Sequence, residues 1–230
     1  MLSNNIQPND DELKSGTLGS RQLRIEVTHS PSSFEELVDR MRDMGHHVDL
    51  LRMPHSGERL FGLLGRYQVD GCDCVVKIAG QQLTEDHPDY GETLVRYIAI
   101  QQEVEGLKGL DGLVPRLVGE IVVGADTVGV LRQFIEGMSL IDAVKDKLLA
   151  PKDAKKKVIE LVKSINDRGF WLWDPEPQNL WFDANGRVLL IEGQCVISMT
   201  EDDHRDPDFS DKQNRIVEII VRACLGEPER

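Results

Sequence analysis

The segment from Trp171 to Gly193, WLWDPEPQNLWFDANGRVLLIEG, restricts the fold of this chain more than any other segment. Leu180 to Asp183 and Arg187 to Ile191 are rich in strand-forming residues, and the Asn185-Gly186 pair between them is a strong short-range signal for a β-hairpin. We therefore predict two antiparallel strands joined by a tight turn. Such a hairpin brings the two ends of the segment together.

The two ends of this hairpin carry three oxygen-bearing side chains. Asp174 and Asn179 precede the first strand, and Glu192 follows the second. Carboxylate and amide oxygens are hard ligands of the kind that Mg²⁺ prefers, and metal-assisted phosphoryl transfer gathers such groups around one site. The sequence therefore predicts that the three side chains face a common site.

The composition limits the size of the fold and the class of partner. With 230 residues, of which 40% are hydrophobic, the chain is long enough for one compact domain or two small lobes around a core. The formal net charge of −13 disfavours a general nucleic-acid or anionic-membrane binder, because both need a basic surface. We expect basic or neutral partners, no nucleic acid and no membrane.

The start of the sequence shows no export signal, and the spacing of the cysteines does not indicate a metal site. The start, MLSNNIQPNDDELKSG, has no basic stretch leading into an apolar one, and no run of about 18 apolar residues occurs, so we expect a cytoplasmic protein. The cysteines form one C-x-C pair and two distant singles, a spacing unlike that of zinc sites. We interpret them as structural thiols: Cys72, Cys74, Cys195 and Cys224.

The remaining pattern predicts a strand-rich first part and a helical second part. Residues 1–30 are polar and indicate a flexible N-terminal arm. Ser33 and Glu36 form a capping-box pattern before an amphipathic helix that ends at Gly45. The pattern then predicts strands near 47–53, 59–69 and 72–78, a helix near 91–110, strands near 117–123 and 127–134, and helices near 139–147, from Pro151 to Gly169 and near 211–225.

This order of elements, followed by Asp-x-x-x-x-Asn before a hairpin, resembles the protein-kinase-like fold over about Val48 to Cys195. Within that family it is most similar to small atypical kinases, including RIO-type and minimal bacterial effector kinases. The resemblance implies a two-lobed α+β fold with a strand-rich N-lobe over residues 31–136 and a reduced helical C-lobe over residues 137–230. It implies an ATP- and Mg-dependent phosphotransferase, with Mn as an alternative metal, acting on protein Ser or Thr hydroxyls.

The family's catalytic residues can be matched one at a time. Lys77 in CVVKIA resembles the third-strand lysine that holds the ATP phosphates, and Glu103 resembles the helix glutamate that pairs with it. Glu105 is the alternative partner for the lysine. Asp174 resembles the catalytic-loop aspartate that accepts the hydroxyl proton. The resemblance thus assigns catalytic roles to Asp174, Lys77 and Glu103.

The metal and nucleotide contacts follow from the same resemblance. Asn179 matches the asparagine that binds a second magnesium, and Glu192 stands where the family has the aspartate of D-F-G. The glycine-rich loop is absent, and the short turn containing Ser56 and Gly57 is the expected phosphate cradle in its place. The adenine is expected to lie against a connector that includes Gln133, Phe134 and Ile135.

Three departures from the family keep other readings open. Glu192 replaces an aspartate, Leu172 and Trp173 replace the His-Arg of H-R-D, and the glycine-rich loop is absent. The first alternative is therefore a pseudokinase, a binding module with little or no catalysis that contacts a protein partner. The second is a small-molecule kinase that uses the same site. The three tryptophans, Trp171, Trp173 and Trp181, are expected to pack the small helical part.

Overall fold

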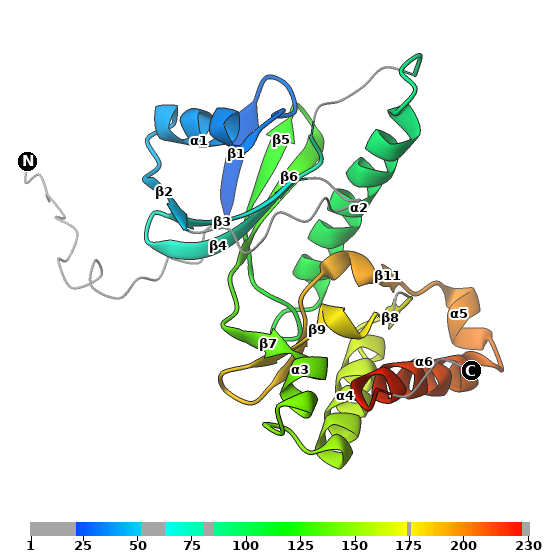
Figure 1. Cartoon of the computed structure of the whole chain (residues 1–230). Coiled ribbons are helices and arrows are strands. Elements are labelled where there is room, and N and C mark those ends of the chain that lie inside the picture. Colours follow the sequence, from blue (N-terminus) through cyan, green and yellow to red (C-terminus); the bar gives the residue numbers. More distant parts are fainter. Residues whose placement is uncertain (1–21, 52–62, 81–84, 174–175, 227–230) are drawn as a thin grey trace, which may run out of the picture.

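The computed structural model describes residues 22–51, 63–80, 85–173 and 176–226. These residues form an α+β fold, as predicted, with one large sheet, two small sheets and several helices (Figure 1). The large sheet is six-stranded, and its strands in spatial order are β1 (Leu23–Val27), β5 (Leu117–Val123), β6 (Asp126–Gln133), β4 (Cys72–Ile78), β3 (Leu63–Val69) and β2 (Val48–Leu51).

Strand β1 corrects the prediction that residues 1–30 are a flexible arm. It pairs with β5 in parallel, and Ile25 at its centre is fully buried. The pattern Leu23, Ile25, Val27 does alternate, but its partner strand lies about a hundred residues later in the sequence. Because a parallel partner is not joined by a local turn, no short-range signal indicates the pairing. Residues 1–21 lie outside the described part of the chain.

The two faces of the large sheet belong to two different hydrophobic clusters. Successive side chains of a strand point to opposite faces, so neighbouring residues of β6 separate, with Leu131 in one cluster and Val130 in the other. Helix α1 (Phe34–Asp43) contributes Leu37 and Met41 to the first cluster. Helix α2 (Tyr90–Gly109) contributes to the second with Ile100, Val104, Leu107 and, just after its end, Leu110.

Helix α1 begins where the sequence indicated. The Ser33 hydroxyl accepts a hydrogen bond from the Glu36 N–H at 3.2 Å, which caps the first turn. The Glu36 carboxylate reaches one residue further back than a capping box requires and accepts from the N–H of Ser32 at 2.9 Å. Gly45 follows the helix with a φ of +91°, a conformation that glycine adopts without strain.

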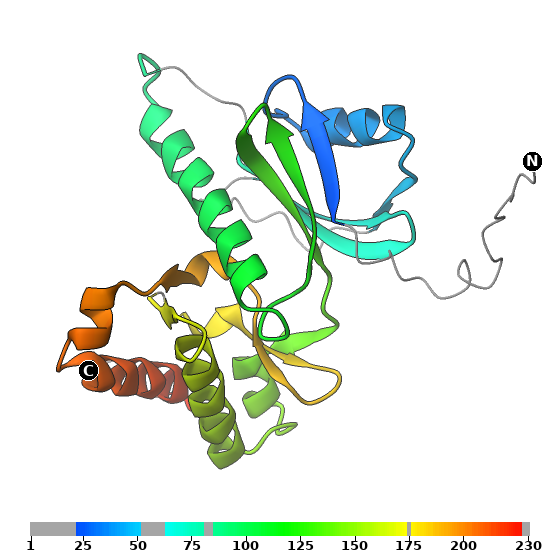
Figure 2. The same ribbon diagram turned by 180° about the vertical axis from the view of Figure 1, so that it is seen from behind.

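Helix α2 is buried along only part of its length. The prediction of one apolar face holds for Val104, Leu107 and Leu110, which are buried, but Val95 and Ile98 are 51% and 47% exposed. Figure 2 shows why: α2 runs from beside the large sheet to the helices at the other end of the molecule, and its first turns extend away from both. The long helix thus links the sheet to the helical part, with its second half in the core.

The helical part surrounds two small sheets. The chain enters it after β6, through β7 (Gly137–Ser139) and α3 (Leu140–Lys145), and continues into α4 (Pro151–Asn166). The rest is β8 (Phe170–Leu172), η1 (Pro177–Asn179), β9 (Leu180–Asp183), β10 (Val188–Leu190), η2 (Gly193–Cys195), β11 (Val196–Ser198), α5 (Glu201–Arg205) and α6 (Phe209–Cys224). The elements that the sequence did not indicate here are β7, β8, η1, η2, β11 and α5, which are too short to show a periodic pattern.

The predicted hairpin is present. Strands β9 and β10 pair antiparallel, with Leu180 opposite Leu190, and β7 pairs with the other side of β9. The Asp183 carboxylate fixes the turn by accepting from the N–H groups of Asn185 at 3.0 Å and Arg187 at 2.7 Å. Gly186 supplies the positive φ, of +76°, that the turn needs.

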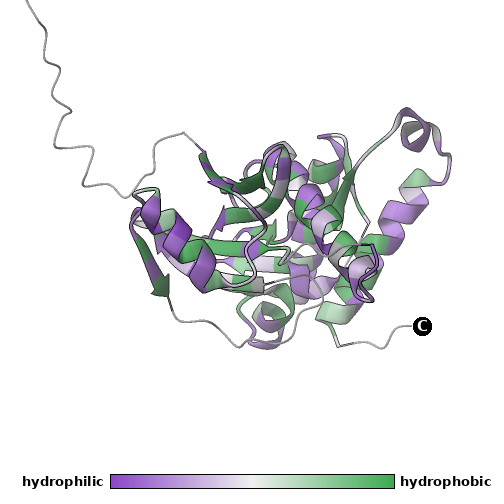
Figure 3. Cartoon of the chain, turned by 90° about the horizontal axis from the view of Figure 1, so that it is seen from above, coloured by the Kyte–Doolittle hydropathy of each residue, from purple (hydrophilic) through white to green (hydrophobic). Residues whose placement is uncertain are grey.

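The distribution of polarity agrees with these packing relations. Seen from above in Figure 3, the strands are mainly hydrophobic, whereas the outer helices alternate hydrophobic and hydrophilic residues. Among the described residues, no helix combines the length and the apolar character needed to cross a membrane. All four cysteines are buried and free, and burial raises the pKa of the Cys224 thiol to about 11. The division into lobes at residues 136 and 137 stays a prediction.

Candidate functional site

Lys77 and Glu103 form a buried ion pair between β4 and α2. The Lys77 Nζ donates to Glu103 Oε2 at 2.9 Å, and the two side chains are 5% and 0% exposed. Glu105, the alternative partner, is exposed on α2 and accepts a hydrogen bond from the Ser198 hydroxyl instead. The helical spacing explains the choice, because residues two positions apart on a helix face in different directions.

Arg132 is a third member of this cluster, and the sequence analysis missed it. Its Nη1 lies 3.4 Å from Glu103 Oε1, and the side chain is 6% exposed. On β6 it stands opposite Val75 of β4, while Val130 stands opposite Lys77, so Arg132 and Lys77 share one face of the sheet. The available signal was an arginine inside the apolar strand sequence TVGVLRQF, since arginine is almost never fully buried without a partner.

The two cations determine the ionisation of Glu103. Burial alone would raise the pKa of this carboxyl, but the charges of Lys77 and Arg132, with the hydrogen bond that Lys77 donates, outweigh burial and hold the pKa below its usual value. Glu103 is therefore the anionic centre of a buried cluster that contains two cations.

Gln194, also missed, links this cluster to Glu192. The Lys77 Nζ donates to Gln194 Oε1 at 2.8 Å, and Gln194 Nε2 donates to Glu192 Oε2 at 2.7 Å. The amide thus presents its oxygen to the ammonium and its N–H to the carboxylate. Two of the three N–H groups of the lysine are used by Glu103 and Gln194.

A contact between two glycines places Gln194 beside the ion pair. A Cβ atom added to Gly106 of α2 would lie 2.3 Å from the carbonyl oxygen of Gly193, and one added to Gly193 would lie 2.5 Å from the carbonyl oxygen of Glu103. Real Cβ atoms do not approach other atoms this closely. Only glycine at both positions lets η2 pack against α2 at this distance, and η2 carries Gln194.

Asn179 and Glu192 lie at the same end of the β9–β10 hairpin, as expected. The N–H of Ile191, the residue before Glu192, donates to the backbone carbonyl of Asn179 at 2.8 Å. The Asn179 side chain is buried, and its Nδ2 donates to Cys195 Sγ at 3.0 Å. A glutamate carboxylate and an asparagine amide supply hard oxygen atoms, which suit Mg²⁺ rather than a soft metal. Among the described residues, no three His, Cys, Asp or Glu side chains gather to hold a metal.

Three predicted site residues fall outside the described part of the chain: Asp174, Ser56 and Gly57. Trp173, which directly precedes Asp174, is described and corrects one expectation. It is 50% exposed rather than packed, because its indole N–H donates to the Gln194 carbonyl at 3.0 Å and leaves the ring at the surface. Its backbone N–H donates to the Cys195 carbonyl at 3.1 Å, so the chain that leads to Asp174 is fixed to η2.

The connector predicted to hold the base follows β6 directly. Gln133 is exposed, and Phe134 and Ile135 are half-buried. The Phe134 N–H donates to the Asp73 carbonyl at 2.8 Å, and the Arg66 guanidinium lies 3.5 Å from the centre of the Phe134 ring. Arg66 also pairs with the Asp73 carboxylate at 2.7 Å. These contacts hold the connector against the large sheet.

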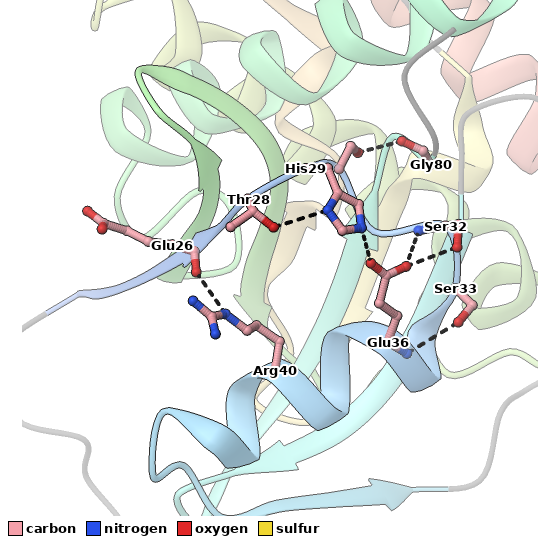
Figure 4. Close-up of polar contacts among 9 residues, drawn as sticks. Glu26, Thr28, His29, Ser32, Ser33, Glu36, Arg40 and Gly80 are labelled. Carbon is pink, nitrogen blue, oxygen red and sulfur yellow. Dashed lines mark hydrogen bonds and ion pairs between the residues drawn. The ribbon is translucent and has the colours of Figure 1, made fainter.

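A separate pocket of about 270 Å³ lies beside α1, and none of the candidate site residues described above lines it. Figure 4 shows the polar contacts around it. Its polar side chains mostly contact one another: the Thr28 hydroxyl lies 3.1 Å from His29 Nδ1, and His29 Nε2 lies 2.5 Å from Glu36 Oε1. Arg40 donates to the Glu26 carbonyl at 3.3 Å. We assign this cluster a structural role, because its contacts join α1 to the segment that follows β1.

Comparisons with known proteins identify no family for the chain. No family model matches, and no curated protein matches. Among solved structures, the crystal structure of WbdD at 2.2 Å superposes with a TM-score of 0.49 and 12% sequence identity. The superposition covers 78% of this chain, and this chain spans 46% of the WbdD chain.

Proposed function

We propose that this chain is a phosphotransferase with a two-lobed, protein-kinase-like fold. Its phosphoryl donor is a nucleoside triphosphate, for which the sequence resemblance implies ATP, and its acceptor is a protein Ser or Thr hydroxyl. The observation that carries the proposal is the buried contact of 2.9 Å between Lys77 on a central strand and Glu103 on a long helix. A lysine is costly to bury, so a lysine that is buried and paired at this position favours a functional role.

The polar cluster continues from this ion pair to the candidate metal ligands. Gln194 joins Lys77 to Glu192 through contacts of 2.8 and 2.7 Å, and Glu192 follows the strand whose end is bonded to Asn179. Lys77, Gln194 and Glu192 thus form one connected set of side chains, and the backbone bond from Ile191 places Asn179 next to it. Such a set suits a triphosphate with its metal, because phosphoryl transfer depends on positioning and on stabilising negative charge.

Each residue has a distinct role in the proposed reaction. Lys77, oriented by Glu103, neutralises the charge of the phosphates, and the third N–H of its ammonium is directed to them. Asp174 accepts a hydrogen bond from the acceptor hydroxyl and orients it for in-line attack. Asn179 and Glu192 would hold Mg²⁺ or Mn²⁺, which supplies charge neutralisation on the phosphate oxygens when bound.

A binding module without catalysis is the second candidate, and one observation favours it. The Gln194 amide already contacts both the Lys77 ammonium and the Glu192 carboxylate. A bound triphosphate and metal must either displace the amide from these two groups or share the groups with it, so the amide competes with the nucleotide. A module that keeps this amide in place binds nucleotide weakly and presents the fold to a protein partner.

Two measurements separate the candidates. The first is a thermal-shift titration of the full chain with nucleotide and MgCl₂ or MnCl₂, because a ligand that binds only the native state raises the melting temperature. The second is transfer of label from [γ-³²P]ATP to a panel of protein acceptors, with Asp174→Ala as the matched control. Phosphotransfer that Asp174→Ala abolishes supports the enzyme. The absence of any thermal shift at millimolar nucleotide contradicts the phosphotransferase and supports the binding module.

A further inference from the structure

Helix α4 carries a basic face that takes no part in the candidate functional site. Seven of the 11 lysines of the chain lie between residues 145 and 163, where only three acidic residues occur. Seven positive and three negative charges give this segment a formal charge of +4 within a chain of −13. Because a local cluster of charge attracts partners of the opposite sign, so uneven a distribution favours a binding partner for this segment.

Four of these lysines form a stripe along the exposed side of α4. Side chains three, four or seven residues apart lie on the same side of a helix. We define the α4 lysine face as the following exposed residues: Lys152, Lys155, Lys156, Ile159 and Lys163. At a rise of about 1.5 Å per residue, the face is about 16 Å long. Figure 1 shows α4 at the end of the molecule farthest from the large sheet, so a partner can reach this face without contacting the sheet.

The charges of the α4 lysine face are available to a ligand. Within the described part of the chain, Lys152, Lys155 and Lys163 form no ion pair and no side-chain hydrogen bond. Lys156 Nζ lies 3.8 Å from Glu160 Oε1, but the two side chains are 76% and 61% exposed. Such a surface pair contributes little, because water and salt screen it. Three of the four lysines are therefore unpaired, and the fourth is only weakly paired.

The net charge of the chain does not decide what this face binds. The total of −13 predicts no membrane partner, but it averages over the whole molecule. At physiological ionic strength, a surface charge is screened beyond about 8 Å. A folded chain of 230 residues has a radius of gyration of about 17 Å. Acidic groups on the far side of the molecule thus contribute little to the potential at α4, and the local lysines determine it.

The composition of the face suits an extended anionic surface better than a single anionic group. All four cations are lysines, although the chain contains 16 arginines and 11 lysines. The planar fork of arginine favours bidentate pairing with one carboxylate or phosphate, whereas lysine is a point charge on a flexible stem. Ile159, between the lysines, is 45% exposed. Flexible cations around an exposed apolar side chain are typical of helices that lie on anionic bilayers.

We propose that the α4 lysine face binds the surface of a membrane that contains acidic phospholipids. The lysines contact the anionic headgroups, and Ile159 enters the boundary between the headgroups and the acyl chains. The contact is peripheral, reversible and sensitive to salt, because it depends mainly on surface charge. It does not depend on the proposed function, since it uses a different surface, and it would place the candidate site next to a membrane.

Co-sedimentation with lipid vesicles tests the proposal on the full-length chain. Vesicles of phosphatidylcholine alone are compared with vesicles that also contain about 30 mol% phosphatidylserine. A lysine near an anionic surface strengthens binding by about fivefold, so the three unpaired lysines predict about 100-fold tighter binding to the anionic vesicles. Raising the NaCl concentration from about 0.1 M to about 1 M should release the protein, because the screening length falls from about 10 Å to about 3 Å.

Two triple variants with equal net charge test whether α4 makes the contact. The lysine variant combines Lys152→Gln, Lys155→Gln and Lys163→Gln. The control variant combines Arg24→Gln, Arg40→Gln and Arg42→Gln, which are exposed residues of β1 and α1 at the other end of the molecule. We expect the lysine variant to lose the preference for anionic vesicles and the control variant to keep it. Thermal unfolding checks that both are folded, and glutamine preserves the helix because its helix propensity resembles that of lysine.

Ile159→Gln separates a bilayer from a soluble polyanion. The substitution keeps the charge of the face and removes the apolar side chain, so binding to anionic vesicles should weaken by about fivefold. Binding to poly-L-glutamate, measured in the same buffer, should not change. Unchanged binding of this variant to vesicles overturns the insertion of Ile159.

Two further results overturn the proposal. Equal losses in the lysine and control variants show that net charge alone drives binding and overturn the assignment to α4. No binding of the wild type to anionic vesicles at low salt overturns the membrane as the partner. If the wild type then binds poly-L-glutamate and the lysine variant does not, the face fits an acidic polypeptide instead.

Discussion

Gly106→Ala adds a methyl group at the point where α2 meets η2, and its effect can be worked out from the distances there. The new Cβ would lie 2.3 Å from the Gly193 carbonyl oxygen and 2.8 Å from its Cα and carbonyl carbon. All three atoms belong to the backbone, so no side chain can rotate away to make room. Relief of the closest contact to 3.4 Å requires α2 and η2 to separate by about 1.1 Å.

Two opposing effects decide the size of the change. Overpacking a well-packed interior costs about 1–3 kcal/mol, and the upper part of that range applies here because backbone must move. Replacing glycine by alanine inside a helix returns about 1 kcal/mol. We therefore expect Gly106→Ala to lower the free energy of unfolding by about 2 kcal/mol. In a protein of this size that corresponds to a fall of roughly 4–8 °C in melting temperature.

Gly91→Ala is the matched control, because Gly91 lies in the same helix and a Cβ added there meets no atom within 4 Å. We expect this variant to be as stable as the wild type or up to about 1 kcal/mol more stable. Both variants are compared by urea unfolding and by thermal unfolding in the absence of ligand. If Gly106→Ala proves as stable as Gly91→Ala, the close glycine contact does not exist in solution, and the placement of Gln194 derived from it is wrong.

Three further changes test the buried charges. Glu103→Gln leaves two buried cations without an anion and should destabilise the protein by about 3–5 kcal/mol in chemical unfolding, whereas Glu105→Gln on the same helix should change stability by less than about 0.5 kcal/mol. The folded state lowers the pKa of Glu103 from its usual value of 4.5, so ionised Glu103 stabilises the protein fully above about pH 4.5. This stabilisation is lost as the pH falls through the lowered pKa of the folded state. The acid unfolding curve of a Glu103→Gln protein should lack this pH-dependent loss of stability. Asp183→Asn weakens the charge-assisted bonds with Arg187, including one of 2.8 Å, and should cost about 1–3 kcal/mol by thermal unfolding.

The elements that were predictable from the sequence are those with local signals. The strand at 72–78 and the strand at 117–123 have the predicted bounds, and the helix predicted over 91–110 is observed over Tyr90–Gly109. These segments combine a clear periodicity with turn residues at both ends. The family resemblance named Glu103 as the partner of Lys77 and left Glu105 as the alternative, and the structure pairs Lys77 with Glu103.

The features that the sequence did not indicate depend on contacts between distant segments. Strand β1 is defined by its pairing with β5, which no local turn encodes. Gln194 lies in a three-residue turn, and its role follows from the approach of η2 to a helix that ends 84 residues earlier. Arg132 showed a signal, a charge within an apolar strand, but its partner on α2 is identified only when the strand and the helix are packed together.

These distant contacts make the candidate site one cooperative unit rather than a set of independent residues. Gly193 fixes Gln194, which contacts Lys77 and Glu192, while Glu103 holds both Lys77 and Arg132. Substitutions within such a network are not additive, because each removes support from the same shared contacts. The Gln194 amide also limits nucleotide binding, because its oxygen already accepts a hydrogen bond from the Lys77 ammonium. A nucleotide can bind this ammonium only by replacing that hydrogen bond or by using the remaining N–H. The choice between an enzyme and a binding module therefore depends on whether phosphate and metal together bind Lys77 and Glu192 more strongly than a single side-chain amide does.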